Sequence, residues 1–149
     1  CHQLEVDGIV LGVLDKENRI DEVRCQILLD KWQNKPATFH RAFDSIDNQI
    51  EATEQLIKLG FERILTSGGK PTAMEGRETI LQLHMRYGDQ IKIMAGSGIS
   101  SLNVEAFSIL DEVHATCKEA IYQDAIGGKY IVSAYSEIKK LIQQFKQNQ

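Results

Sequence analysis

Apolar runs and helix-like repeats alternate along the chain. The first run, at residues 7–14, is almost continuously apolar, which is typical of a strand buried on both faces of a parallel sheet. Later runs of this kind are each followed by a segment in which apolar residues recur every three or four positions. The pattern predicts strands at residues 7–14, 38–43, 61–66, 91–95 and 112–115. It predicts helices at residues 21–35, 48–59, 72–87, 100–110 and 133–147.

The ends and faces of these helices can also be predicted. Asp47 or Asn48 is expected to cap the second helix, and Gly60 stands where a left-handed C-terminal cap favours glycine. The apolar residues expected to face the core are Val23, Ile27 and Trp32 in the first helix, Ile46, Ile50, Leu56 and Ile57 in the second, Ile80 and Leu83 in the third, and Ile138, Leu141, Ile142 and Phe145 in the last. The segment from residue 116 to residue 128 is expected to be irregular.

The alternation of strands and helices repeats about five times along the chain. It predicts an α/β fold made of parallel βα repeats with right-handed crossovers. Neither a linker-like nor a low-complexity segment interrupts the repeats, so residues 1–149 are expected to form a single domain.

Composition and charge exclude several classes of protein. The chain is 42% hydrophobic and carries a net charge of −4, with its basic residues scattered. A nucleic-acid surface needs clustered Lys and Arg, so no nucleic-acid partner is expected. No apolar run is long enough to span a bilayer, so no membrane partner is expected. Cys1, Cys25 and Cys117 are too widely spaced for a disulfide framework, which favours the cytoplasm, and Cys25 is expected to be a small core residue.

Polar or glycine residues follow the C-terminal end of every predicted strand. They are Asp15; His40, Arg41 and Asp44; Ser67, Gly68, Gly69 and Lys70; Gly96, Ser97 and Gly98; and His114 and Thr116. In open α/β sheets and in TIM barrels, ligands bind at these strand ends. The five groups therefore predict a single site along this edge of the sheet.

The ionisable residues among them are candidates for catalysis. His40 is suited to act as general acid or base, with Asp44 orienting it and Arg41 holding a carboxylate or phosphate. His114 is a further candidate catalytic residue. The structural alternative is that Arg41 and Asp44 pair with each other while His40 is a hydrogen-bonded core histidine.

The glycine-containing loops are candidates for binding an anion. Backbone N–H groups of the two loops, and the positive end of a capped helix beginning near Ser100, are expected to form an anion cradle. Its residues are Ser67, Gly68, Gly96, Ser97 and Gly98. The structural alternative is tight strand-to-helix turning, where only glycine fits. No nucleophile elbow, Walker motif or dinucleotide fingerprint is present.

Five blocks of the sequence together resemble the CutC copper homeostasis proteins. The blocks are residues 8–15, 38–44 (Thr-Phe-His-Arg-Ala-Phe-Asp), 63–69, 93–98 and 112–114, and their order and spacing also match over residues 7–145. The resemblance implies a TIM-type barrel and a cytoplasmic protein that binds copper and takes part in copper homeostasis. It places the following residues around the mouth of the barrel: His40, Arg41, Asp44, Ser67, Gly68, Gly96, Gly98 and His114.

The resemblance covers only part of such a barrel. It extends to the fourth to eighth strands, so the chain is expected to be a truncated member that is incomplete at its N-terminus, with about five of eight βα units. Five parallel strands cannot close a barrel of this kind and leave two unpaired edges. Three outcomes are therefore compatible with the sequence: a homo-oligomer formed through these edges, a chain that complements a missing piece, or a poorly stable remnant.

The residues by themselves offer His114 with Cys117 as the candidate metal site, with Cys1 and His2 at the first two positions as an alternative, and the resemblance supplies copper as the metal. Cu(I) favours soft thiolate ligands, and the nearest combination is His114 with Cys117. Three hypotheses about function follow. The first is a copper-binding protein of copper homeostasis, the second a TIM-barrel enzyme or binding protein for a small phosphorylated or carboxylated metabolite, and the third a truncated relic without activity.

Overall fold

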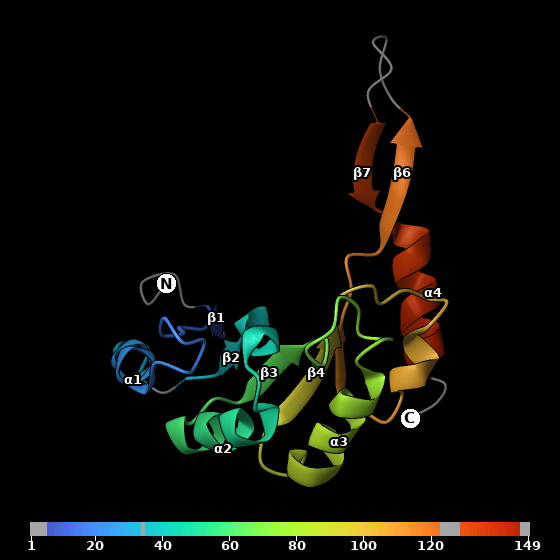
Figure 1. Cartoon of the computed structure of the whole chain (residues 1–149). Coiled ribbons are helices and arrows are strands. Elements are labelled where there is room, and N and C mark those ends of the chain that lie inside the picture. The colour runs from blue at the N-terminus through green and yellow to red at the C-terminus, as the bar shows by residue number, and fades with distance from the viewer. Residues whose placement is uncertain (1–5, 34, 123–128, 147–149) are drawn as a thin grey trace.

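Five parallel strands form a sheet in which their order, β1-β2-β3-β4-β5, is also their order along the chain (Figure 1). The computed structural model of the protein describes residues 6–33, 35–122 and 129–146, so Cys1 and His2 lie outside the described residues. The strands of the sheet are β1 (Ile9–Leu11), β2 (Ala37–Phe39), β3 (Arg63–Thr66), β4 (Lys92–Gly96) and β5 (Glu112–His114). This confirms the prediction of parallel βα repeats and of a partial TIM-type barrel.

Helices connect successive strands and cover one face of the sheet. They are α1 (Glu22–Lys31), α2 (Gln49–Leu59) and α3 (Arg77–Tyr87), with two short 3₁₀ helices, η2 (Arg41–Ser45) and η3 (Val104–Phe107). Figure 1 shows α2 and α3 lying side by side along this face. The other face is open at β1, where the side chain of Val10 is 65% exposed.

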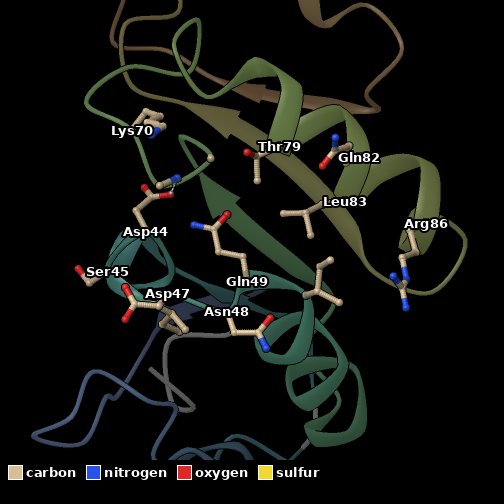
Figure 2. Close-up of a pocket in the computed structure, with 14 residues that line it drawn as sticks. Asp44, Ser45, Asp47, Asn48, Gln49, Lys70, Thr79, Gln82, Leu83 and Arg86 are labelled. Carbon is tan, nitrogen blue, oxygen red and sulfur yellow. Dashed lines mark hydrogen bonds between the residues drawn. The ribbon is translucent and has the colours of Figure 1, made fainter.

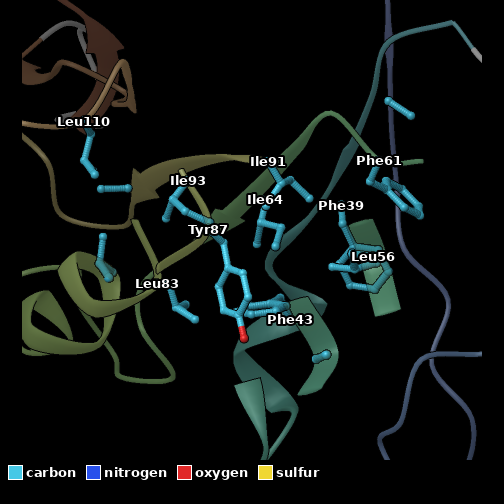
Figure 3. Close-up of a cluster of buried hydrophobic side chains, with 14 of the residues drawn as sticks. Phe39, Phe43, Leu56, Phe61, Ile64, Leu83, Tyr87, Ile91, Ile93 and Leu110 are labelled. Atoms are coloured by element: carbon cyan, nitrogen blue, oxygen red, sulfur yellow. The ribbon is translucent and has the colours of Figure 1, made fainter. Parts of the chain in front are cut away.

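The core lies between the sheet and these helices (Figure 3). Phe39 and Ile64 of the strands are completely buried, and so are Leu56 of α2 and Ile80 of α3. The ring of Phe39 packs edge-on against that of Phe61 with 5.3 Å between centroids, a favourable aromatic geometry. The strand residues that alternate with these point away from the helices, because successive side chains of a strand face opposite sides.

Three of the helix ends follow the capping chemistry expected of their residues. The side chain of Asp21 accepts a hydrogen bond from the backbone N–H of Arg24 at the start of α1. Asn48, one of the two predicted caps, does the same for Glu51 at the start of α2. Gly60 ends α2 with a φ of 86°, the left-handed conformation that favours glycine.

The predicted buried face of the first helix is wrong for Val23 and Ile27 and confirmed for Trp32. Val23 and Ile27 are 71% and 48% exposed, whereas Cys25 and Leu29 are fully buried and Trp32 is nearly so. Both pairs have the i, i+4 spacing of a helix face, so periodicity does not distinguish them. The prediction that Cys25 is a core residue is confirmed. In the other helices Leu56, Ile80, Leu83 and Leu141 are buried as predicted, whereas Ile50 and Ile142 are exposed.

The helix predicted at residues 100–110 is reduced to the short 3₁₀ helix η3. The side chain of Asn103 accepts a hydrogen bond from the backbone N–H of Ser100 and donates one to the carbonyl of Gly98. Side-chain bonds of this kind compete with the backbone bonds that a helix would make. The third helix also begins later than predicted, at Arg77.

A hairpin occupies part of the segment that was expected to be irregular. Strands β6 (Lys118–Tyr122) and β7 (Lys129–Ser133) pair antiparallel and form a separate two-stranded sheet. Figure 1 shows the hairpin extending away from the main sheet, followed by helix α4 (Tyr135–Lys146). Residues 119–122 and 129–132 are rich in β-branched and aromatic types, which favour strands. Among the helices that the structure describes, none is both long enough and apolar enough to cross a bilayer.

Candidate functional site

The loops that follow β2 and β3 meet at the carboxyl-terminal edge of the sheet. This edge is where parallel strands present their ligand-binding loops. The β2 loop continues directly into η2, and His40 is the N-terminal cap of this short helix. The β3 loop carries Ser67, Gly68 and Gly69, of which both glycines have positive φ.

Asp44 joins these two loops. One of its carboxylate oxygens accepts hydrogen bonds from the hydroxyl of Thr66 at 2.5 Å, the N–H of Ser67 at 2.9 Å and the N–H of Gly69 at 3.1 Å. The other accepts from Nε of Arg41 at 2.8 Å and lies 2.9 Å from the hydroxyl of Ser67. A carboxylate of the protein itself therefore takes up backbone N–H groups of the β3 loop.

The same contacts keep Asp44 ionised. Burial opposes the charged form, but the hydrogen bonds from Thr66, Arg41, Gly69 and Ser67 outweigh it, so the pKa of Asp44 is lowered from its ordinary value. A carboxylate with a lowered pKa and occupied oxygens is poorly suited to accept a proton during a reaction. The geometry thus gives Asp44 the role of positioning Arg41 and the β3 loop.

Arg41 is held at two points and remains partly open to solvent. Its Nε donates to Asp44, and its Nη2 donates to the hydroxyl of Ser67 at 2.7 Å. Its side chain is nevertheless 43% exposed. A guanidinium fixed in this way is preorganised for binding a carboxylate or phosphate, because little rotational freedom remains to be lost.

His40 is fixed in one tautomer by its own backbone. Its Nδ1 accepts a hydrogen bond from the N–H of Ala42 at 3.2 Å, so the neutral ring carries its proton on Nε2. The ring lies against Gly12 of the β1 end, where a Cβ would come within 2.8 Å of it. No hydrogen bond between His40 and Asp44 is formed. In this tautomer His40 can donate a hydrogen bond from Nε2.

The loop after β4 is bound to the loop after β3. Ser97 has a φ of 82°, its hydroxyl donates to the carbonyl of Pro71 at 2.8 Å, and its own carbonyl accepts from the N–H of Ala73. The carbonyl of Gly98 is taken by Asn103. Because η3 has only four residues, the helix end expected to support an anion at Gly96, Ser97 and Gly98 is not formed. This loop therefore lacks one component of the predicted cradle.

His114 and Cys117 lie at the β5 edge of the sheet, away from His40 at the end of β2. His114 ends β5, and β3 and β4 lie between it and β2. Cys117 has a φ of 46°, and burial, followed by the nearby charge of Glu137, raises the pKa of its thiol. Within the described residues, no three His, Cys, Asp or Glu side chains are grouped so as to hold a metal ion. His114 with Cys117 thus remains a candidate pair only.

A charged cluster at the opposite end of the strands was not predicted from the sequence. Arg63 donates to Glu112 through Nε and Nη2 and to the hydroxyl of Thr38 at 3.2 Å, and Lys92 lies 3.4 Å from Glu112. Burial raises the pKa of Glu112, but Arg63 and Lys92 lower it more, and the net shift is downward. The sequence signal that could have revealed this cluster is the presence of charged residues, Arg63 and Lys92, at paired positions of adjacent strands. The cluster links four strands and is structural.

Comparison of sequences places these features in a family. Residues 1–119 match the model of the CutC family. A family protein CutC from Xanthomonas campestris pv. campestris (strain 8004) is 34% identical over an alignment that covers 96% of this chain and 65% of the relative. Another, from Pasteurella multocida (strain Pm70), is 46% identical over 68% of this chain and 41% of the relative. The chain therefore spans less than two thirds of the length of these relatives.

The comparison of structures agrees with the comparison of sequences. A crystal structure from Streptococcus agalactiae, described as a candidate copper homeostasis protein CutC, matches with a TM-score of 0.71 and 33% identity over 76% of this chain and 57% of that one. A structure described as native KDPGal matches with a TM-score of 0.61 over 98% of this chain and 61% of that one. Since its sequence identity is 9%, this second match shows the fold alone.

Proposed function

The chain belongs to the CutC family, and from this premise we propose that its strand-end site binds a small carboxylated or phosphorylated metabolite. The observation that carries the proposal is the guanidinium of Arg41, fixed by Asp44 and Ser67 at the strand ends yet partly exposed. His40 supplies a second donor from the preceding position. Two adjacent donors at the mouth of a partial barrel are suited to an anionic oxygen. A cytoplasmic location is part of this proposal.

The chemistry of the site is the stabilisation of negative charge. Arg41 offers a fixed positive charge, and Nε2 of His40 offers a neutral N–H. Donors held in place in this way stabilise a bound anion or a charge that develops on a carbonyl oxygen. The carboxylate of Asp44 and the hydroxyl of Ser67 accept hydrogen bonds from Arg41 and hold it in place. The residues that bind the ligand are therefore distinct from the residues that position Arg41.

The test is thermal unfolding of the chain with inorganic phosphate or malonate, against chloride at the same ionic strength. Binding to the folded state raises the free energy of unfolding by about 2.7 kcal/mol at a hundredfold excess over Kd. In the variant His40→Asn the response is expected to fall, while the fold is kept, because Asn also caps helices well. His84→Asn on α3 is the matched control. Equal effects of phosphate, malonate and chloride on the wild type would refute the proposal.

Copper handling is the second candidate function. It is favoured by the description of the Streptococcus agalactiae structure, which is 33% identical to this chain. Copper would be the cargo of such a protein, and His114 with Cys117 is the candidate pair for Cu(I), since thiolate and imidazole suit it. The raised pKa of Cys117 works against this role, because the thiol must lose its proton on binding.

Anaerobic competition with a chromophoric Cu(I) chelator tests this second candidate. If the pair binds copper, the double variant His114→Ala/Cys117→Ser loses Cu(I) binding, whereas Cys25→Ala retains it, since Cys25 is buried in the core. Undiminished binding by the double variant would exclude this pair as the ligands. No binding by the wild type would leave the anion site as the function of the described residues.

A further inference from the structure

The two donors proposed for the strand-end site are held in place by different means. Arg41 is bound by the carboxylate of Asp44. This carboxylate lies against the β3 loop, where it also accepts a hydrogen bond from the N–H of Gly69 (Figure 2). The ring of His40 makes one hydrogen bond within the described residues, from the N–H of Ala42 to Nδ1 at 3.2 Å. A single bond at the long end of the usual range holds a ring weakly, so the orientation of His40 depends on its packing as well.

Gly12, directly after β1, provides that packing. The backbone N–H of His40 donates to the carbonyl of Leu11 at 3.0 Å, which brings the two chain segments together. A Cβ added to Gly12 would lie 2.7 Å from Cε1 and 2.8 Å from Nδ1 of the His40 ring. Both distances are well below the optimal separation of such atoms. The imidazole therefore occupies the space that a side chain at position 12 would need.

The backbone of Gly12 gives no other reason for a glycine. Its φ is not positive, so a residue with a Cβ can adopt its conformation. On the other side of the added Cβ, Cζ of Phe39 would be 3.2 Å away. Phe39 is completely buried and packs against Phe61, whereas His40 is only half-buried. An added Cβ would therefore displace the ring of His40 and not that of Phe39.

We propose that Gly12 is a positioning residue for His40. By lacking a Cβ it holds the imidazole in the orientation in which Nδ1 accepts from Ala42 and Nε2 carries the proton. Its role in binding rests on the proposed anion site, where this N–H is the donor that accompanies Arg41. Donors stabilise an anion best when they are held in place before it arrives. The site thus takes its donors from the end of β2, while β1 orients one of them and β3 the other.

The tautomer of His40 tests the inference without any ligand. At about pH 8.5, where histidine is neutral, two-bond ¹H–¹⁵N correlations in ¹⁵N-labelled protein distinguish a proton on Nε2 from one on Nδ1. The wild type is expected to show only the Nε2–H form for His40, whose signals are identified by their loss in His40→Asn. Gly12→Ala is expected to show the mixture of a free imidazole. Its Ala42 amide should also exchange with solvent faster, because the acceptor has moved away.

Controls separate this effect from a general disturbance of the fold. The signals of His84 on α3 and His114 on β5 should be the same in the wild type and in Gly12→Ala. Gly8→Ala, at the other end of β1, is the matched variant, since the nearest atoms to its added Cβ would be those of Pro36. It should keep the Nε2–H form of His40. An unchanged tautomer and unchanged Ala42 exchange in folded Gly12→Ala would overturn the inference.

Phosphate binding measures the consequence for the site. Gly12→Ala is expected to weaken binding about tenfold, the effect of misplacing one donor. Adding Gly12→Ala to His40→Asn should weaken it no further, since both changes act on the same group. A wild type that binds neither phosphate nor malonate would refute the anion site, whereas the tautomer would still decide whether Gly12 positions His40. The two failures are therefore distinguishable.

The variant His40→Ala keeps the inference testable if Gly12→Ala does not fold. Without the ring, the space beside Gly12 is free. Gly12→Ala should therefore lower the melting temperature less in the His40→Ala background than in the wild type, and the double variant should unfold cooperatively. An equal or larger loss in this background would overturn the inference and make Phe39 or the backbone the reason for the glycine.

Discussion

At the scale of single residues, the carboxylate of Asp44 occupies the position that the sequence predicts for an anion at a glycine-containing loop. Backbone N–H groups of Ser67 and Gly69 converge on it, together with the hydroxyl of Thr66. Arg41 balances its charge from the other side. Any external anion at this position would compete with a carboxylate tethered to the same chain. The exposed part of Arg41 is therefore a better place for a ligand than the N–H groups of the loop.

Asp44→Asn is expected to destabilise the fold. The amide retains one acceptor but loses the charge, so Arg41 is left without its partner and some donors of the β3 loop are left unsatisfied. The side chain is only 10% exposed, and the loss should be about 2–4 kcal/mol in the free energy of unfolding, measured by urea denaturation. Asp47→Asn, at an exposed position of the same loop, should change it by less than about 0.5 kcal/mol. Equal effects would show that Asp44 is not a structural link.

The lowered pKa of Asp44 makes this contribution dependent on pH. The unfolded chain takes up a proton near the ordinary value of 3.8, whereas the folded chain does so only at lower pH. The stabilisation is complete above the ordinary value and is lost as pH falls through the lowered folded pKa. Urea denaturation at pH 6 and pH 3 should therefore show a smaller acid-induced loss of stability in Asp44→Asn than in the wild type. An identical loss in both would contradict the lowered pKa.

The contacts that Asp44 makes were only partly predictable from the sequence. The pairing of Arg41 with Asp44 was predicted as the structural alternative for these residues. The strand predicted at residues 38–43 was wrong beyond Phe39, however, and the pair lies in the short helix η2. The contacts of Asp44 with Thr66 and Ser67 join residues more than twenty positions apart. They depend on the relative placement of two loops, which local pattern does not encode.

At the scale of elements, the end of α2 depends on the left-handed conformation of Gly60. An added Cβ would meet no atom within 4 Å, so the cost of Gly60→Ala should come from the backbone alone. We expect a loss of about 1–2 kcal/mol in the free energy of unfolding, and a smaller loss for Gly60→Asn, since Asn tolerates this conformation better. Urea denaturation of both variants measures the difference. Equal stability of Gly60→Ala and the wild type would contradict this account.

The positions of the strands and of most helices were predictable from the sequence, whereas the buried face of each helix was less so. Apolar runs located all five parallel strands, although the helices bury only one face of the sheet and Val10 on the other face is 65% exposed. In α1, however, Val23 and Ile27 satisfy the helical period as well as Cys25 and Leu29 do. The sheet selects one of the two faces, and that selection is a tertiary effect. The hairpin β6–β7 was missed because its strands lie outside the βα repeat.

At the scale of the whole molecule, the sheet has two edges and an open face. In the described residues β1 pairs only with β2, and β5 pairs only with β4. Val10, at the β1 edge, exposes most of its side chain on the face opposite the helices. Unpaired edges next to exposed apolar side chains favour association with other strands. We therefore propose that isolated chains associate through this edge.

Val10→Lys should weaken that association, because a charge at a sheet edge disfavours pairing with another strand. Sedimentation velocity over a range of protein concentrations is expected to show self-association of the wild type and a larger monomer fraction in the variant. Met85→Lys, at an exposed position of α3, is the matched control for the added charge. A monomeric wild type at all concentrations would refute the proposal.

The strand order has a consequence for how the sheet forms. Each strand pairs with the one that precedes it in the chain, and a single crossover separates every pair. Contacts between residues that are close in sequence form faster than those between distant ones, because less loop entropy is lost on closing them. The sheet can therefore grow one βα unit at a time as the polypeptide emerges from the ribosome, with each completed strand serving as the template for the next.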